Sequence, residues 1–147
     1  MIELVPIRES IEENGEFISN PLCRDSLHQT IDFYKTVGFS PPWIGYYAMR
    51  ENQLVGCAGF KGRPIDGKVE IAYATFEMYQ RQGIGAEMCK LLVNLSLKRD
   101  PGVRITARTL PEKNFSTQIL EKNGFTCMGT VNDVDDGEVW EWELLSS

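Results

Sequence analysis

The sequence predicts a mixed α/β fold in which helices flank a central sheet that is mostly antiparallel but contains one parallel strand pair. Three observations lead to this prediction. Apolar residues alternate with a period of two between residues 43 and 76, which indicates a hairpin and a third strand. An amphipathic helical segment, residues 83–99, comes next, and residues 103–110 again alternate like a strand. Such a strand–helix–strand step requires a parallel pair with a right-handed crossover.

The N-terminal part of the chain is expected to hold one strand and one or two helices. Residues 2–8 have the composition of a short strand, and Pro6 places it at a sheet edge because proline has no N–H to donate. Apolar positions between residues 21 and 37 fit helical spacing, and Gly38 ends the helical segment.

Turn residues separate the elements that follow. Glu51-Asn52-Gln53 and Asp66-Gly67 interrupt the first strands after residue 43, and Asp100-Pro101-Gly102 ends the amphipathic helix. In the next helix, Asn114 is a candidate N-cap and Gly124 a stop signal. We therefore expect strands at 43–49, 54–61, 69–76 and 103–110, helices at 83–99 and 111–123, and a closing hairpin of strands 125–131 and 139–145.

Length and composition limit the classes of function. The 147 residues are expected to form one domain, residues 1–147, which is large enough to bury about two thirds of its surface. The net charge of −6 would repel the phosphates of a nucleic acid, and it fits either a cationic partner or simple solubility. The N-terminus lacks the apolar stretch of a signal peptide, and no segment is apolar enough to span a membrane. We therefore expect a cytoplasmic protein without membrane or nucleic-acid partners.

The cysteines and the histidine argue against a metal site. Four cysteines are widely separated without a CxxC pair, and His28 is the only histidine. We therefore expect reduced thiols and no metal. A Ser-His-Asp or Cys-His mechanism would have to use His28, and nothing near it in the sequence supports that role. Cys57 and Cys89 lie in apolar runs, where a buried and unreactive thiol is expected.

The most informative segment is Gln80-Arg-Gln-Gly83-Ile-Gly85, which lies between a predicted strand and the start of the amphipathic helix. A helix N-terminus offers free backbone N–H groups and the positive end of the helix dipole, and both favour a phosphate group. A glycine at 83 lets the anion approach the backbone. The segment lacks the Gly-Lys-Ser/Thr of a P-loop, and its position disfavours a dinucleotide fold. The alternative is a turn that serves packing alone.

Two motifs resemble those of the GNAT superfamily of N-acetyltransferases. The segment just described is similar to the Arg/Gln-x-x-Gly-x-Gly/Ala motif of that superfamily. A second block, Asn114-Phe-Ser-Thr117-Gln-Ile-Leu-Glu-Lys-Asn-Gly124-Phe125, resembles the RimJ/RimL-like branch of ribosomal-protein N-terminal acetyltransferases and their relatives, although Thr117 stands where serine is usual. The resemblance extends over residues 43–145, and the expected order of strands and helices agrees with the GNAT fold.

The resemblance implies a GNAT fold whose parallel strand pair splays around acetyl-CoA. It also implies transfer of the acetyl group to a primary amine, of a small molecule or a protein N-terminus, by direct attack in a ternary complex. The loop N–H groups would hold the pyrophosphate, and the preceding strand end would pair with the pantetheine arm as an added strand does. The residues implied in cofactor binding are Ala74, Thr75, Phe76, Gln80, Arg81, Gln82, Gly83, Ile84, Gly85, Asn114 and Thr117.

The chemistry at a thioester requires a base, because an amine attacks only as the neutral species. The resemblance points to Glu70, near the start of the strand that leads into the loop, as the catalytic residue. An exposed or substrate-positioning glutamate is the alternative. The developing oxyanion needs a donor, and the resemblance implies a backbone N–H near Thr75 or Phe76.

The donor for the leaving thiolate departs from the family pattern. Many GNAT enzymes have a tyrosine four residues before the glycine of the Gly-Phe pair, where this chain has Leu120, which cannot donate a proton. Tyr73 and Tyr79 are candidate replacements, although aromatic residues in such strands usually belong to the core. The missing tyrosine leaves one alternative function open, a catalytically silent acyl-CoA-binding or regulatory module.

The sequence does not identify the acceptor amine. Loops and N-terminal helices usually determine acceptor specificity, and here these are residues 19–40 and 132–138. Asp133, Asp135, Asp136 and Glu138 would attract a cationic amine, or they form a solvated turn. Both a monomer and a homodimer are compatible with the sequence.

Overall fold

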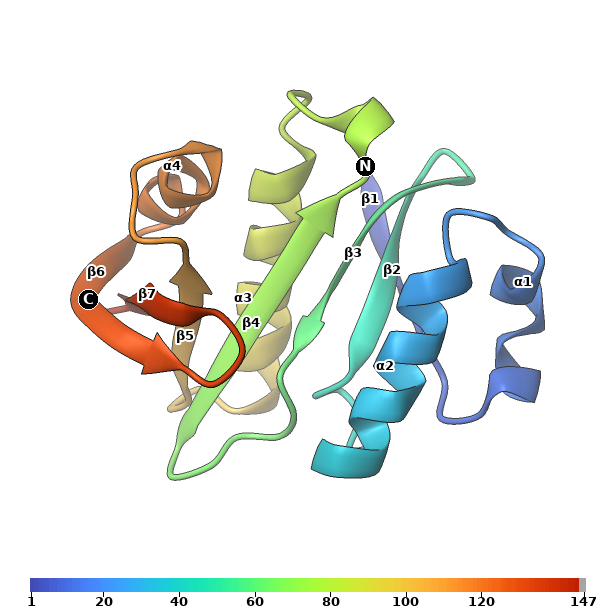
Figure 1. Ribbon diagram of the computed structural model, residues 1–147, viewed down its shortest axis with the longest axis horizontal. Helices are drawn as coiled ribbons and strands as arrows, with labels where there is room; N and C mark the ends of the chain where they lie inside the picture. Colours follow the sequence, from blue (N-terminus) through green and yellow to red (C-terminus); the bar gives the residue numbers. More distant parts are fainter. Residues whose placement is uncertain (146–147) are drawn as a thin grey trace.

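Within residues 1–145, which the computed structural model describes, seven strands form one sheet in the order β1-β2-β3-β4-β5-β7-β6 (Figure 1). Neighbouring strands are antiparallel, except that β4 and β5 are parallel. The strands are β1 (Ile2–Pro6), β2 (Gly45–Arg50), β3 (Gln53–Phe60), β4 (Lys68–Thr75), β5 (Arg104–Thr109), β6 (Phe125–Asp133) and β7 (Gly137–Leu144). The helices are α1 (Gly15–Ile18), α2 (Arg24–Val37), α3 (Ile84–Arg99) and α4 (Phe115–Lys122), with short 3-10 turns η1 (Ile11–Asn14) and η2 (Glu77–Tyr79). The predicted fold class is therefore confirmed.

The element boundaries differ from the prediction at a few places. The short elements η1 and α1 precede α2, and their few residues carry no apolar periodicity that predicts them. α4 begins at Phe115 rather than at residue 111, because Asn114 forms its N-cap and residues 111–113 belong to the preceding loop. The closing hairpin is longer than predicted, since β6 continues to Asp133 and β7 starts at Gly137. The edge position that Pro6 predicts for β1 is confirmed.

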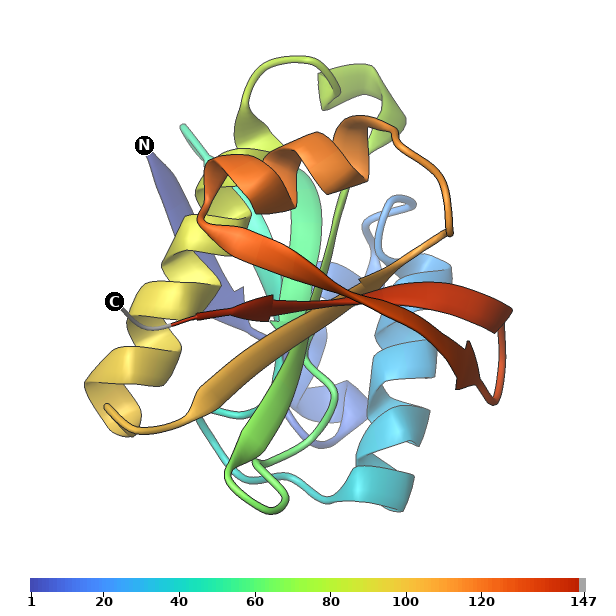
Figure 2. The ribbon, with the colours of Figure 1, turned by 90° about the vertical axis from the view of Figure 1, so that its left-hand side faces the viewer.

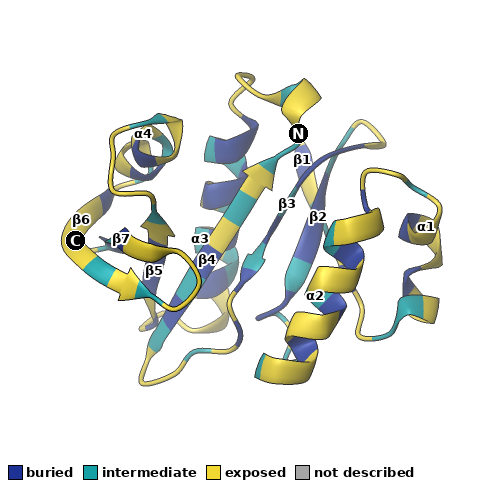
Figure 3. Cartoon of the chain, viewed as in Figure 1, coloured by how far each residue is buried: buried dark blue, intermediate teal, exposed yellow. Residues whose placement is uncertain are grey.

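Helices cover both faces of the sheet. In Figure 1, α3 lies behind the sheet and α2 in front of it, and Figure 2 shows α4 at one end of α3. On the back face, a side chain at Gly56 of β3 would approach Met88 of α3 to 3.2 Å. On the front face, the hydroxyls of Ser26 on α2 and Tyr47 on β2 are hydrogen-bonded at 2.7 Å. The core therefore consists of two apolar layers, one on each side of the sheet (Figure 3).

The buried face of α3 repeats at helical spacing. Ile84, Met88 and Leu92 are buried, four residues apart, whereas Leu91 and Leu95 are only partly buried. None of the helices in the described part of the chain is long and apolar enough to cross a membrane.

β4 and β5 pair only where they begin. Lys68 to Glu70 are in register with Arg104 to Thr106, and no pairing follows beyond that point among residues 1–145. β4 remains paired with β3 up to Thr75, and β5 remains paired with β7 up to Thr109. A gap therefore opens inside the sheet, between β4 and β5, and widens toward their C-terminal ends (Figure 1).

The packing of α3 against the sheet predicts a clear difference between two leucines of that helix. Leu92 is completely buried and Leu97 is 38% exposed. Leu92→Ala should lower the free energy of unfolding by about 2–5 kcal/mol, because it leaves a cavity in the core. Leu97→Ala should change it by no more than about 0.5 kcal/mol. Urea denaturation of both variants measures this difference, and equal losses would contradict the packing described.

Candidate functional site

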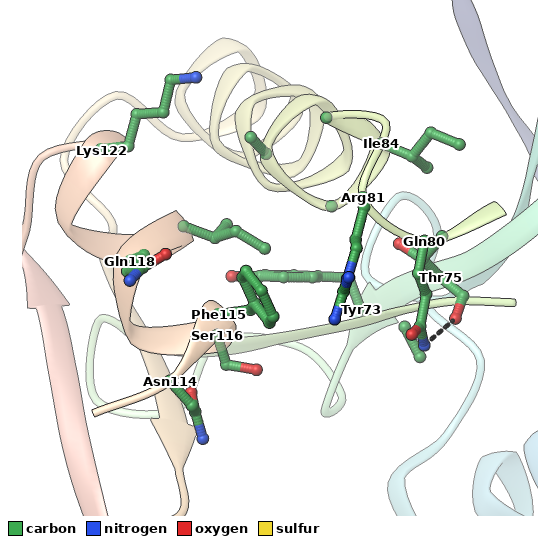
Figure 4. Close-up of a pocket in the computed structure, with 15 residues that line it drawn as sticks. Tyr73, Thr75, Gln80, Arg81, Ile84, Asn114, Phe115, Ser116, Gln118 and Lys122 are labelled. Carbon is green, nitrogen blue, oxygen red and sulfur yellow. Dashed lines mark hydrogen bonds between the residues drawn. The ribbon is translucent and has the colours of Figure 1, made fainter. Parts of the chain in front are cut away.

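A cavity of about 670 Å³ lies between the N-terminal end of α3, the helix α4 and the end of β4 (Figure 4). It opens beside the gap between β4 and β5. Three segments that are far apart in sequence therefore meet here. The residues that line the cavity are Tyr73, Ala74, Thr75, Gln80, Arg81, Gly83, Ile84, Gly85, Ala86, Asn114, Phe115, Ser116, Gln118, Ile119 and Lys122.

The loop before α3 has a backbone suited to an anion. Gly83 is the N-cap of α3 and has a φ of 78°, in the left-handed region that glycine adopts without strain. A side chain at Gly83 would meet no atom within 4 Å, so the space beside this backbone is empty and a ligand can reach it. The first N–H groups of the helix, from Ile84 to Ala86, lie beyond this glycine and have no partner within the helix. Free N–H groups and the helix dipole together favour a phosphate at this end of the cavity.

Gly85 has a different role, which is to allow two helices to approach. A Cβ at this position would lie 2.8 Å from Cδ1 of Ile119 on α4. The absence of a side chain therefore sets the distance between α3 and α4. The two glycines of the motif serve separate purposes, one toward the cavity and one toward helix packing.

The wall formed by α4 is held by a reciprocal cap. The side-chain oxygen of Asn114 accepts a hydrogen bond from the Thr117 N–H at 3.2 Å, and the Thr117 hydroxyl accepts one from the Asn114 N–H at 3.0 Å. Thr117 is buried by this arrangement. The predicted N-cap is confirmed, and the cap fixes the start of α4 against the cavity.

A cation and an aromatic ring bridge the mouth of the cavity. The guanidinium of Arg81, in the loop, lies 5.6 Å from the ring centroid of Phe115, at the start of α4. Phe115 is 64% exposed, and Lys122, about two turns further along α4, also lines the cavity. Figure 4 shows Arg81 extending from the loop toward Phe115. The positive side chain of Arg81 thus lies at the end of the cavity that the helix dipole also makes positive.

The backbone polar groups of β4 point alternately toward β3 and toward the gap, as in any antiparallel pair. The backbone N–H of Phe76 donates a hydrogen bond to the carbonyl oxygen of Val55 at 2.9 Å. The backbone carbonyl oxygen of Glu70 accepts one from the N–H of Lys61, also at 2.9 Å. These even-numbered positions therefore face β3. The positions whose N–H and C=O groups face the gap are Ile71, Tyr73 and Thr75.

This alternation distinguishes the residues that the sequence assigned to the strand end. Thr75 directs its backbone into the gap, where an extended ligand can pair with it as an additional strand would. Phe76 cannot serve as oxyanion donor through its N–H, which Val55 already engages. Ala74 lines the cavity, but its backbone pairs toward β3. The polar backbone of the gap therefore comes from Thr75 and from Tyr73.

Glu70 lies outside the cavity, on the front face of β4. Its carboxylate is 3.6 Å from Lys61 Nζ and 3.8 Å from Arg108 Nε. Burial raises the pKa of Glu70 above its ordinary value, and the two cations oppose that rise. Arg108 pairs more closely with Asp133, at 2.9 Å.

Asp133 fixes the closing hairpin to this charge cluster. Its carboxylate accepts hydrogen bonds from the N–H groups of Asp135 and Asp136 and from Arg108. These donors, the Asp135 N–H first, lower the pKa of Asp133 to about 2. The hairpin tip therefore keeps its negative charge at any physiological pH.

The structure brings most of the predicted cofactor residues together and leaves a few outside. Eight of them line the cavity. The three that do not are engaged elsewhere: the side chain of Gln82 accepts a hydrogen bond from Arg50 at 2.7 Å, Thr117 forms the cap of α4, and the backbone of Phe76 pairs with β3. The lining residues that the sequence analysis did not assign to the cofactor are Tyr73, Ala86, Phe115, Ser116, Gln118, Ile119 and Lys122. The lining residues on α4 are spaced three and four positions apart and therefore share one face of the helix. This spacing in the sequence could have identified them, given that Asn114 starts the helix.

The other sequence-based expectations concern thiols and metals. The four cysteines are free, and Cys89 is buried as predicted, whereas Cys57 is only partly buried. Burial raises the pKa of the Cys89 thiol to about 11, which makes it a poor nucleophile. Among residues 1–145, no three His, Cys, Asp or Glu side chains are grouped to hold a metal ion.

Sequence comparisons relate this chain to acetyltransferases. The sequence profile of the Acetyltransferase (GNAT) domain matches residues 7–126. The protein named uncharacterized N-acetyltransferase YjdG of Bacillus subtilis (strain 168) is 39% identical, and the alignment covers 78% of this chain and 69% of that protein.

Solved structures with the same fold have different acceptors in their names. RimL, a ribosomal-protein α-N-acetyltransferase in complex with coenzyme A, superposes with a TM-score of 0.71 at 18% identity and covers 97% of this chain and 92% of its own. A chimera of the spermidine N-acetyltransferase SpeG from Vibrio cholerae superposes with a TM-score of 0.72 at 12% identity, covering 98% and 95%. At these identities the two structures are evidence for the fold alone.

The open backbone at Gly83 yields a testable prediction. Gly83→Val should weaken coenzyme A binding roughly 10- to 10²-fold, because its side chain would block the N–H groups from a charged acceptor. The left-handed φ will also strain the variant, by about 1–3 kcal/mol. Gly67→Val is the matched control, since Gly67 has a φ of 76° with open space around it and lies outside the cavity. Melting curves should show similar destabilisation of both variants, and titration calorimetry should show weakened coenzyme A binding only for Gly83→Val. Normal coenzyme A binding by Gly83→Val would mean that the loop is only a packing turn.

Proposed function

Because the chain belongs to the GNAT acetyltransferase family and is an acetyl-CoA-dependent acyltransferase, we propose that it transfers the acetyl group of acetyl-CoA to a primary amine by direct attack in a ternary complex. One observation carries the proposal. The cavity joins an anion-binding helix start to a gap between two strands whose backbone groups are unpaired, and this matches a long ligand with phosphates at one end and amide groups along its arm.

The residues present fit this cosubstrate in polarity and shape. The N–H groups from Gly83 onward, with the guanidinium of Arg81, would hold the phosphates. The gap-facing backbone groups of Tyr73 and the C=O of Thr75 would pair with the amides of the pantetheine arm, which leaves the N–H of Thr75 free for another acceptor. When bound, acetyl-CoA supplies an acetyl group activated as a thioester.

The acceptor would approach from the front face of the sheet. Along that face of β4, Glu70 is followed by Ala72 and Ala74, both of which are exposed and carry only methyl groups. Residues two apart on a strand point to the same face about 6.6 Å apart. On its front face, β4 therefore carries no bulky side chain between the carboxylate of Glu70 and the gap. Phosphate-binding groups and Glu70 lie on opposite sides of the sheet, so the two substrates do not compete for space.

Glu70 would accept the amine proton in this arrangement, directly or through one water. Burial raises the pKa of Glu70 above the ordinary glutamate value, toward the range of a useful base, and the nearby cations Lys61 and Arg108 oppose that rise. The N–H of Thr75 faces the gap and would donate to the developing oxyanion.

A cationic acceptor fits the charge of the closing hairpin. Asp133, Asp135, Asp136 and Glu138 lie at or beside its tip, and only Asp133 is paired with a cation in the described residues. An amine substrate arrives protonated, so a negative rim raises its local concentration.

The cosubstrate assignment predicts ligand-specific stabilisation. At a hundredfold excess over Kd, acetyl-CoA should stabilise the native state by about 2.7 kcal/mol, which is roughly 5–10 °C in Tm. NAD and ATP should cause no comparable shift, because neither has a pantetheine arm for the gap. Differential scanning fluorimetry measures this. A flat response to acetyl-CoA up to millimolar concentration would rule out the assignment.

The role of Glu70 predicts a specific pH dependence. Glu70→Gln should keep coenzyme affinity and lower kcat roughly 10²–10⁴-fold, the usual contribution of a positioned base. The deficit should shrink as pH rises, because more of the amine arrives neutral. Wild type should lose activity on the acid side with an apparent pKa above the ordinary glutamate value, since burial raises the pKa of Glu70.

Glu141→Gln is the matched control for this experiment. Glu141 shares Arg108 with Glu70, and its side chain is 16% exposed against 20% for Glu70. Loss of the ion-pair cluster alone would therefore affect both variants. If Glu70→Gln keeps a wild-type pH–rate profile, Glu70 is not the base.

A further inference from the structure

We propose that the hydroxyl of Tyr73 donates a hydrogen bond to the sulfur of the departing coenzyme A thiolate. The inference rests on the proposed acetyl transfer and assigns a residue to the one step for which the sequence offered no group. In that step the C–N bond forms, the C–S bond breaks, and the electron pair of the broken bond stays on sulfur. A donor beside the sulfur stabilises the negative charge that develops there.

The usual source of such a donor is absent on α4. Leu120 is 1% exposed, carries no proton to donate and packs into the core. Of the two tyrosines considered from sequence, Tyr79 does not line the cavity. It belongs to η2, donates its hydroxyl hydrogen to Gln53 and lies against the Arg50 guanidinium. Tyr73 is the one that lies in the cavity.

Tyr73 lies in the stretch of β4 along which the arm of a bound thioester would run. It is near the middle of the unpaired part of β4, two residues before Thr75, on the same face as the residues that contact α3. Figure 4 shows its ring extending from β4 across the cavity, with the hydroxyl toward α4. The backbone of Tyr73 faces the gap and its side chain faces the cavity. The same residue can therefore contact both the pantetheine arm and the thioester of bound acetyl-CoA.

The hydroxyl of Tyr73 is also less engaged than those of the other tyrosines. Its polar neighbour is the thiol of Cys89, a weak hydrogen-bonding partner. The other four tyrosine hydroxyls each have an oxygen partner: Tyr34 with Ile7 O, Tyr46 with Pro42 O, Tyr47 with Ser26 Oγ, and Tyr79 with Gln53 Oε1. A bound sulfur atom would therefore not have to displace a strong partner.

Burial decides which role the phenol can have. It raises the pKa of Tyr73 above the ordinary value of a tyrosine, and the Cys89 thiol adds to the rise. The group therefore keeps its proton at neutral pH. Tyr73 stabilises the thiolate as a hydrogen-bond donor, and the thiolate takes its proton from water after release. The amine proton leaves separately through the base on the front face, so the proton count is balanced.

The test compares Tyr73→Phe with Tyr79→Phe in single-turnover reactions with acetyl-CoA and one verified amine. Tyr73→Phe should lower the rate of acetyl transfer roughly 10- to 10²-fold, the range of a hydrogen bond to a charged group. Its affinity for coenzyme A should match that of wild type, because the hydroxyl acts only when charge develops on sulfur. Tyr79→Phe should react like wild type.

A leaving-group comparison separates this role from a structural one. The selenoester analogue of acetyl-CoA releases a selenolate, a weaker base that needs less stabilisation. The deficit of Tyr73→Phe should therefore shrink with the selenoester, whereas a packing defect would slow both substrates equally. If Tyr73→Phe does not fold, replacing Tyr73 by a difluorotyrosine keeps the ring and strengthens the donor, and the rate with acetyl-CoA should rise.

The outcomes distinguish this inference from the proposed function. If wild type acetylates the amine and Tyr73→Phe keeps the same rate, or has the same deficit with both leaving groups, the role of Tyr73 is disproved and acetyl transfer stands. An unchanged rate for the difluorotyrosine protein would disprove it too. If wild type binds acetyl-CoA and acetylates none of a broad panel of amines, the proposed function fails, and this inference fails with it.

Discussion

The separation of β4 from β5 is the constraint on which the rest of the site depends. Parallel pairing ends after Glu70, so the following stretch of β4 has backbone groups on one side without a strand partner. Unpaired backbone groups away from water are costly, and a protein keeps them only where a ligand or water satisfies them. The helices α3 and α4 lie behind this part of the sheet and, with the end of β4, enclose the cavity.

The alternation of side chains along β4 divides the chemistry between two faces. Tyr73 and Thr75 face the helices, whereas Glu70 and the two exposed alanines face the front. Two reactants can therefore approach one strand from opposite faces and meet near Ala74, which also lines the cavity. The distance between the flanking helices depends on a single missing side chain at Gly85, against which Ile119 packs. The site is thus built mainly from backbone geometry and close packing, and needs few special side chains.

The fold could be predicted from the sequence because its signals are local. The period of two through β2–β4, the helical period of α3 and the turn residues between them each depend on neighbouring residues, and the strand–helix–strand step fixed the parallel pair. The loop before α3 could also be located, because Gly83 stands at a helix start.

What could not be predicted depends on distant parts of the chain. Which N–H groups of β4 face the gap follows from its register with β3, so the sequence could not exclude Phe76 as a donor. The approach of Phe115 to Arg81 requires the packing of α4 on α3. The charged neighbours of Glu70 come from Lys61, just after β3, from Arg108 on β5, and from Asp133 on the closing hairpin. The gap also has a mechanical consequence. Within residues 1–145, three ladder pairs join β4 to β5, and a ligand that paired with the following stretch of β4 would lengthen this junction and slow amide hydrogen exchange along it.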